Sequence, residues 1–102
     1  MFLHILTANY LNHYKIAIEF NNGSHGVADL SDSLTGKIFE PLQDINFFKQ
    51  FKVEEELGTI CWENGADFAP EYLYFLAFKN VPELQEQFQQ WGYLTNKIPV
   101  SV

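Results

Sequence analysis

The side chains best suited to chemistry in this sequence are three histidines, one cysteine and thirteen carboxylates. A metal site would need several of them at spacings such as HxH, HxxxH or HExxH, and His4, His13 and His25 follow none of these patterns. The lone Cys61 can form neither a thiolate cluster nor an internal disulfide, and its apolar neighbours predict that it packs as a small hydrophobic residue. The sequence therefore predicts no metal site and no cofactor.

Motifs for nucleophilic catalysis and for nucleotide binding are also missing. Cys61, Ser24, Ser31 and Ser33 lie outside the nucleophile-elbow and cysteine-nucleophile signatures. The six glycines form neither a GxGxxG pattern nor a P-loop. We therefore expect no catalytic residue and no enzyme activity.

One polar stretch between two apolar segments could be either a functional site or a corner of the fold. Asn64 and Gly65 have the residue types that turn a chain, and Asp67 could accept backbone N–H groups at the turn or at the start of the next helix. Trp62 could cover the hinge with its large ring, and Pro70 suits the first turn of a helix. We interpret these five residues as a structural corner.

The charge of the chain limits the classes of partner. Six Lys and Arg against thirteen Asp and Glu give a formal net charge of −7, which opposes binding to phosphate backbones. We expect no direct nucleic-acid binding, and the acidity favours a small basic protein as a partner. No apolar run approaches the roughly 20 residues that span a bilayer, so we expect no membrane segment. One unpaired cysteine and no signal peptide pattern favour the cytoplasm.

The N-terminal half has the pattern of strands. Residues 13–20 alternate between apolar and polar types, which predicts a half-buried strand, and an earlier strand is expected over roughly residues 3–10. The pair Asn22-Gly23 predicts a two-residue hairpin with a returning strand over 25–30. In that hairpin Val27 would lie opposite Ile18.

The middle of the chain alternates between turns and short elements. We expect a helical turn over 29–36 capped by Ser31, and an extended link over 38–42 because proline disfavours a helical residue before it. A helix capped by its first residue is predicted over 44–51, and a second hairpin over 52–62.

Two helices are predicted near the C-terminus. The first, Pro70 to Lys79, carries aromatic residues on nearly every side and must be covered by another element. The second, over 81–91 and capped by Asn80, has an apolar stripe that could cover it, and Gly92 would end it. The candidate interface comprises Tyr72, Phe75, Phe78, Leu84, Phe88 and Trp91. The second helix could pack within the same chain or across a two-fold dimer, and the short link slightly favours the dimer.

These elements predict an α+β fold. We expect a small antiparallel sheet of about five strands, made of two hairpins and an N-terminal strand, with a short central helix and two C-terminal helices. Residues 1–79 would form the α+β unit, and residues 80–102 a helix and tail that pack on it within one domain.

Several short motifs together resemble a small bacterial family known as domain of unknown function 2442. The resemblance covers roughly residues 3–76 and is carried by Ala28-Asp29-Leu30-Ser31, Phe39-Glu40-Pro41-Leu42, Asp44 with Phe47-Phe48, and the segments 56–60, 62–67 and 70–74. It implies a compact α+β domain with an antiparallel sheet and no established activity, cofactor or catalytic residue. Ala69 stands where the family often has a capping residue, which implies a less firm start to the last family helix.

The resemblance also implies two contexts for such a domain. Some family members precede a helix-turn-helix DNA-binding domain, and others are encoded beside a second small protein in pairs proposed to be toxin and antitoxin. The segment after Phe78 is too short for a helix-turn-helix domain and is not basic, so the resemblance gives no reason to expect DNA binding here. Our leading hypothesis is a non-enzymatic interaction or regulatory module, with an antitoxin-like role as one form of it. The alternatives are a ligand-binding domain or enzyme with an unrecognised site, and a homo-oligomeric structural protein.

Overall fold

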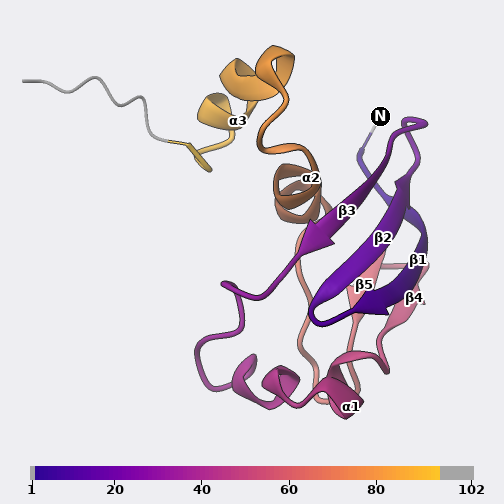
Figure 1. Ribbon diagram of the computed structural model, residues 1–102. Coiled ribbons are helices and arrows are strands. Elements are labelled where there is room, and N and C mark those ends of the chain that lie inside the picture. Colours follow the sequence, from indigo (N-terminus) through magenta and orange to yellow (C-terminus); the bar gives the residue numbers. More distant parts are fainter. Residues whose placement is uncertain (1, 95–102) are drawn as a thin grey trace, which may run out of the picture.

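The computed structural model describes residues 2–94 of the 102-residue chain. Its strands form two antiparallel sheets, and its helices lie at one end and along one side of them (Figure 1). The larger sheet has the order β1-β2-β3 and the smaller one pairs β4 with β5. The strands are β1 (Ile5–Asn12), β2 (Lys15–Phe20), β3 (His25–Asp29), β4 (Lys52–Glu54) and β5 (Thr59–Cys61). The predicted α+β class is confirmed, whereas the strands belong to two sheets instead of one.

The alternating pattern of β2 places one face of the larger sheet in the core. Ile16, Ile18 and Phe20 are at most 3% exposed, because successive side chains of a strand point to opposite faces. The strand begins at Lys15 and not at residue 13, since His13 has a φ of 49° in the turn from β1. The smaller sheet adjoins β1, where the N–H of Ile5 donates to the carbonyl of Gly58 at 2.9 Å.

Three residues, and not the predicted two, form the turn between Phe20 and Ser24, whose backbones are joined by a hydrogen bond from the Phe20 N–H to the Ser24 carbonyl at 2.9 Å. Within this turn only Gly23 has a positive φ, 88°, whereas a two-residue type I′ turn needs two such residues. The Gly23 N–H donates to the Phe20 carbonyl at 3.0 Å, which closes a type I turn before the glycine. The side chain of Asn22 accepts a hydrogen bond from the Ser24 N–H at 3.0 Å and so stabilises this arrangement.

The longer turn moves the pairing of β2 with β3 by one residue. Ile18 lies opposite Gly26, and Val27 lies opposite Ala17 on the outer face, where Val27 is 43% exposed. The predicted pairing of Val27 with Ile18 is therefore wrong. Ala28 takes the buried position instead, because a shift of one residue exchanges the two faces of a strand.

The segment after β3 forms a non-helical turn, whereas a short helical turn was predicted over 29–36. The Asp29 carboxylate accepts the Ser31 N–H at 3.0 Å, so Ser31 donates to the turn and does not cap a helix. The Ser33 N–H donates to the Leu30 carbonyl at 2.9 Å, which closes a single turn that is not continued as a helix. Leu30 and Leu34 are both buried and anchor the segment to the core.

The link before the central helix is helical where we expected extended chain. Glu40–Gln43 forms the 3-10 helix η1, in which Pro41 occupies the first turn and needs no N–H partner. Helix α1 (Ile45–Phe48) follows, and Asp44 caps it as predicted by accepting the Asn46 N–H at 3.0 Å. The helix is shorter than the predicted 44–51.

Helix α2 (Pro70–Phe78) packs on β3, and Gly26 permits their close approach. A Cβ added to Gly26 would lie 2.8 Å from the ring of Phe78 and 3.0 Å from the Cβ of Ala77. Any larger residue would push the helix away from the strand. None of the helices in residues 2–94 combines the length and the apolar character that crossing a membrane requires.

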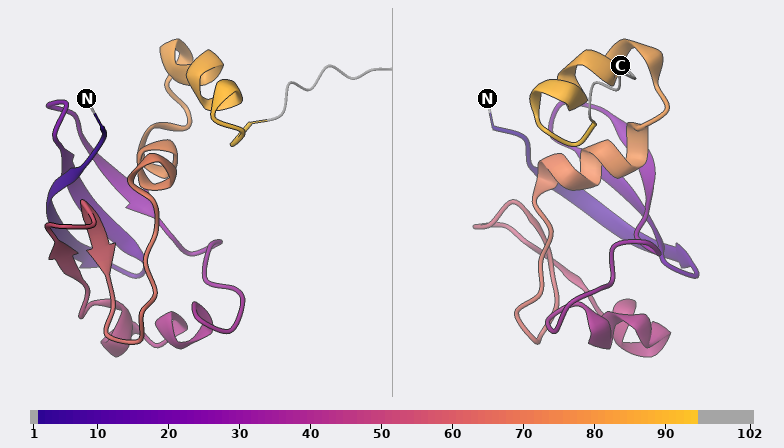
Figure 2. Two further views of the ribbon diagram at one scale, coloured as in Figure 1. Left: turned by 180° about the vertical axis from the view of Figure 1, so that it is seen from behind. Right: turned by 90° about the vertical axis from the view of Figure 1, so that its left-hand side faces the viewer.

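The predicted second C-terminal helix is present but starts differently. It comprises the 3-10 helix η2 (Pro82–Leu84) and α3 (Gln85–Gln90), which together lie over α2 (Figure 2). Val81 is the N-cap, without a side-chain hydrogen bond, so the predicted cap by Asn80 is wrong. Gly92, at a φ of 89°, ends α3 as expected. The predicted tail beyond residue 94 lies outside the described residues.

Candidate functional site

Trp62 fills the inside of the predicted corner. It is 3% exposed, and its indole Nε1 donates to the main-chain carbonyl of Phe48 at 2.7 Å. Its ring lies 5.8 Å from that of Phe48, 6.0 Å from Phe51 and 5.9 Å from Phe68, measured between centroids. The tryptophan therefore joins α1 to the segment that leads into α2 and offers no surface to a ligand.

Asn64 and Gly65 turn the chain outside this tryptophan. The Asn64 side chain donates to the Ile38 carbonyl at 3.0 Å and accepts from the Ala66 N–H at 3.1 Å. Gly65 has a φ of 92°, and its N–H donates to the Trp62 carbonyl at 2.9 Å. Asn64 is thus bonded to the backbone of its own turn and of a neighbouring loop, and Gly65 to the backbone of its own turn.

Asp67 does not have the role that we expected. Cys61 and Asp67 form an isolated β-bridge, so side chains alternate along this segment, with Ala66 and Phe68 buried and Asp67 exposed. Its carboxylate therefore points away from the turn, where Asn64 accepts the N–H instead. Asp67 does not cap α2 either: the N-cap is Ala69, which makes no side-chain hydrogen bond, and Pro70 opens the helix.

The residues of the candidate interface divide into different contacts. Phe88 of α3 is fully buried, with its ring 5.2 Å from Phe75. Phe78 turns toward the sheet, where its ring lies 6.1 Å from Phe20. Tyr72 faces the corner, where it stacks on Phe68 at 5.8 Å. Of the three aromatic residues predicted on α2, Phe75 is therefore the one that meets Phe88.

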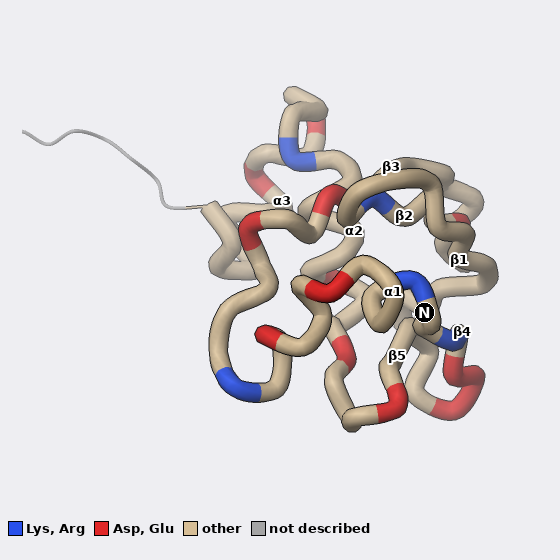
Figure 3. The backbone as a smooth tube through the Cα atoms, turned by 60° about the horizontal axis from the view of Figure 1, so that its bottom comes forward, with Lys and Arg blue, Asp and Glu red and all other residues tan. Residues whose placement is uncertain are grey.

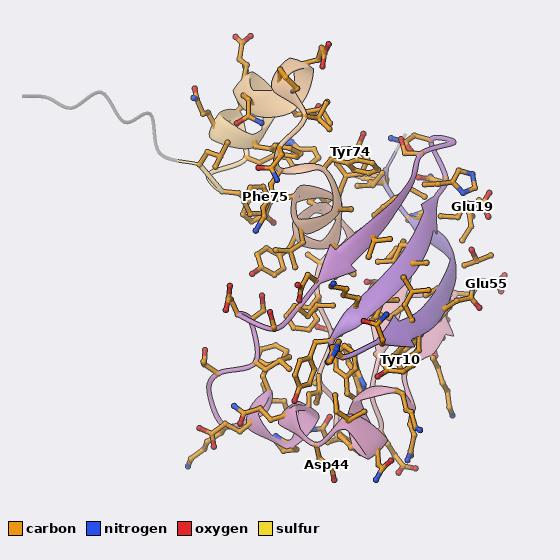
Figure 4. The ribbon with its side chains drawn as sticks, viewed as in Figure 1. Tyr10, Glu19, Asp44, Glu55, Tyr74 and Phe75 are labelled. Carbon is orange, nitrogen blue, oxygen red and sulfur yellow. The ribbon has the colours of Figure 1, made fainter. Side chains whose placement is uncertain are left out.

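Tyr74 is the aromatic residue of this interface that we did not predict. Its ring lies 6.2 Å from Phe88 and 6.1 Å from Trp91, and it is only 8% exposed (Figure 4). Tyr74 and Phe75 together face α3, and Leu84 packs at the edge of the same core. Periodicity did not identify it, because Tyr74 stands one helical turn before Phe78, which faces the sheet.

A cleft separates α2 and α3 from the N-terminal segment, and we call it the α2–α3 cleft. Its volume is about 280 Å³. It is lined by Phe2, Leu3, Asn21, Asn22, Glu71, Tyr74, Gln87 and Trp91. Side chains from four separate parts of the chain therefore meet there, including α3, which lies beyond residue 79.

Asn21 holds the N-terminal wall of the α2–α3 cleft. Its side-chain amide donates to the Phe2 carbonyl at 2.8 Å, and its oxygen accepts the His4 N–H at 2.8 Å. The Asn21 N–H also donates to the His4 carbonyl at 2.9 Å. These three hydrogen bonds fix the segment before β1 against the turn between β2 and β3.

A second surface combines carboxylates with exposed apolar side chains. Three consecutive glutamates stand at the end of β4 and in the turn to β5, seen as a red stretch beside β4 in Figure 3. Around it Leu6 is 53% exposed, Val53 37% and Leu57 55%. Leu6, Val53 and Glu55 also line one shallow hollow of about 360 Å³. We call Glu54, Glu55, Glu56, Leu6, Val53 and Leu57 the acidic turn surface.

Among the ionisable groups in the described part of the chain, two have shifted pKa values. The Ser31 N–H lowers the pKa of Asp29; partial burial opposes this, and the Ser31 hydroxyl and the charges of Lys15 and Lys79 lower the pKa further. Burial raises the pKa of the Tyr93 hydroxyl, and Glu71 and Tyr72 raise it further. Within residues 2–94 no three His, Cys, Asp or Glu side chains gather as metal ligands would.

Comparison with known proteins assigns the chain to a family. No curated protein and no solved structure matches it. A family model described as "Protein of unknown function (DUF2442)" matches residues 5–79, which includes both sheets, the corner and α2. The match begins after Phe2 and Leu3 and stops before η2 and α3, so two walls of the α2–α3 cleft come from outside the matched region. The chain belongs to the DUF2442 family of proteins of unknown function.

Proposed function

We propose that this chain is a non-enzymatic interaction module that binds a basic protein partner through the acidic turn surface. The observation that carries the proposal is the combination of three consecutive carboxylates with exposed Leu6, Val53 and Leu57. Carboxylates steer a basic partner to the surface, and apolar side chains supply the area that association needs. Exposed apolar residues beside a charged turn are otherwise unfavourable in water.

The overall charge supports a basic partner over an acidic one. The chain carries a net charge of −7, and the acidic turn surface holds three of its thirteen acidic residues in consecutive positions. Electrostatic attraction of this kind raises association rates and weakens with salt. An antitoxin-like role, in which the chain binds and neutralises a small basic protein, is one form of this proposal.

The product of the neighbouring gene is the partner to test first. The two proteins would be co-expressed with an affinity tag on this chain, and we expect co-purification that weakens as the salt concentration rises. The triple variant Glu55→Gln, Glu56→Gln and Leu57→Ala should lose the partner. The control variant Glu83→Gln and Glu86→Gln removes the same charge from exposed positions of η2 and α3, and it should retain the partner.

The outcomes separate a specific surface from a general charge effect. Equal loss of the partner in both variants would mean that net charge alone drives binding, which contradicts the proposal. Full retention in the triple variant would exclude the acidic turn surface. Growth of cells that express the partner with and without this chain tests the antitoxin-like form, in which only co-expression of the two restores growth.

A further inference from the structure

The α2–α3 cleft has the side chains that recognise an organic cation. Glu71 supplies a carboxylate, and Tyr74 and Trp91 supply two aromatic rings. Asn21, Asn22 and Gln87 add amides, and neither Lys nor Arg is among the residues that line the cleft in the described part of the chain. A carboxylate attracts a cation, and the faces of Tyr and Trp rings do the same through their negative quadrupoles.

The two rings are arranged as adjacent walls. Their centroids lie 6.1 Å apart and their planes are inclined by 61°, which is an edge-to-face contact, so the two rings touch each other and together line one side of the cleft. Tyr74 is 8% exposed and is held by Phe78, Phe20 and Phe88, with ring centroids 4.7, 5.0 and 6.2 Å away. The walls are therefore preformed, which reduces the ordering that a ligand would have to impose.

Polar groups of the cleft have capacity left for a ligand. The Asn22 amide reaches the Tyr74 hydroxyl only at 3.5 Å, the long limit of a hydrogen bond. Glu71 makes no salt bridge with the described residues. A carboxylate in the first turn of α2 is favourable for the helix dipole, but this does not account for the convergence of aromatic rings and amides around it.

The volume and the charge of the cleft limit the class of ligand that it can bind. A volume of about 280 Å³ lies just below the roughly 300–1,000 Å³ of sites for drug-sized molecules, so the cleft suits a small molecule or a single side chain. An anion would face the Glu71 carboxylate. A bare metal ion would find only one carboxylate, whereas Mg²⁺ and Ca²⁺ require several oxygen ligands.

We propose that the α2–α3 cleft binds a small alkylammonium cation. Glu71 provides the ion pair, the ammonium group packs against the side of the cleft that Tyr74 and Trp91 form, and Asn22 and Gln87 orient its substituents. This site is independent of the proposed partner binding, because its residues lie outside the acidic turn surface. It also gives α3, which the family match does not include, a role in recognition.

The test measures binding of three cations and one neutral isostere to the full chain. Choline, a quaternary ammonium ion, and protonated n-butylamine represent free small-molecule cations. N-acetyl-lysine methylamide represents a lysine side chain of a protein, and 3,3-dimethylbutan-1-ol is the neutral isostere of choline. Titration calorimetry and the melting temperature serve as readouts. We expect at least one cation to bind and to raise the melting temperature, and the neutral isostere to do neither. The preferred cation identifies the source of the ligand.

Variants test the assigned roles. Glu71→Gln should weaken binding of the preferred cation by about tenfold or more while the melting temperature of the ligand-free protein stays within a few degrees. Glu86→Gln removes a carboxylate from an exposed position of α3 and should bind as the wild type does. Trp91→Leu should also weaken binding. If this substitution unfolds α3, the comparison of Glu71→Gln with Glu86→Gln still tests whether the cleft binds the cation.

Three results would overturn the proposal. Failure of all three cations to bind at about 10 mM would exclude an alkylammonium site of any useful affinity. Equal binding of the neutral isostere would show that the cleft recognises shape without charge. Unchanged affinity in Glu71→Gln would remove the carboxylate from the site.

Discussion

The indole of Trp62 and the main-chain carbonyl of Phe48 are joined by a hydrogen bond of 2.7 Å inside the core. Trp62→Phe keeps an aromatic ring but leaves that buried carbonyl without its partner, so we expect a loss of about 1–3 kcal/mol in the free energy of unfolding. Urea denaturation measures this loss. Trp91→Phe changes a half-buried indole and should cost less; equal losses in the two variants would contradict the importance of this hydrogen bond.

The turn outside Trp62 depends on Asn64 and not on Asp67. Asn64→Ala removes hydrogen bonds to the Ile38 carbonyl and from the Ala66 N–H, and we expect it to destabilise the fold by about 0.5–2 kcal/mol, as the loss of a capping side chain does. Asp67→Ala alters an exposed side chain and should stay within about 0.5 kcal/mol of the wild type. Thermal denaturation of both variants compares them, and the reverse order would restore the role first assigned to Asp67.

Gly26 sets the distance between β3 and α2. Gly26→Ala places a methyl group 2.8 Å from the ring of Phe78, and the resulting overpacking should cost about 1–3 kcal/mol. Gly36→Ala is a useful comparison, because no atom lies within 4 Å of its added Cβ and its cost arises from a φ of 93° alone. Circular dichroism during thermal unfolding measures both. A Gly26→Ala variant as stable as the wild type would mean that α2 can move without loss of packing.

The lowered pKa of Asp29 predicts a loss of stability in acid. Since the folded state lowers the pKa below the ordinary 3.8, the contribution of this carboxylate is present above that value and is lost as the pH falls through the folded pKa. Asp29→Asn keeps an oxygen acceptor for the Ser31 N–H but cannot titrate. The free energy of unfolding of Asp29→Asn should therefore decrease less than that of the wild type as the pH is lowered from about 4. Parallel curves for the two proteins would contradict this assignment.

Phe88 attaches α3 to the rest of the chain. Phe88→Ala should remove up to about 3–5 kcal/mol of packing, or less if α3 detaches and leaves no cavity. The loss of near-ultraviolet dichroism from the aromatic cluster reports this detachment. The wild-type melting temperature should not depend on protein concentration, because Phe88 is buried within a single chain. A melting temperature that rises with concentration would support exchange of α3 across a dimer.

The parts of the fold that local chemistry determines could be predicted. Alternation identified β2, the side chain of Asp44 identified the start of α1, and Pro70 identified the start of α2. Each signal lies within a few residues of the feature that it determines. The class of the fold followed from the order of these elements.

Features that depend on competition between interactions could not be predicted in the same way. Asn22-Gly23 fits two turns, and the hydrogen bond from the Ser24 N–H to the Asn22 side chain accompanies the longer one. Helix α2 is aromatic on nearly every side, so periodicity did not reveal that Tyr74 meets α3 while Phe78 meets the sheet. The α2–α3 cleft joins residues from both ends of the chain, and no local pattern brings Phe2, Glu71 and Trp91 together.

The division of the strands into two sheets has a consequence for the order of folding. Each sheet pairs strands that are neighbours in sequence, so each closes only short loops and can form rapidly. The hydrogen bond from the Ile5 N–H to the Gly58 carbonyl joins the sheets across half the chain, and it closes a much longer loop at a greater entropic cost. We therefore expect a three-stranded unit and a hairpin that each form rapidly, and docking of the two limits the folding rate.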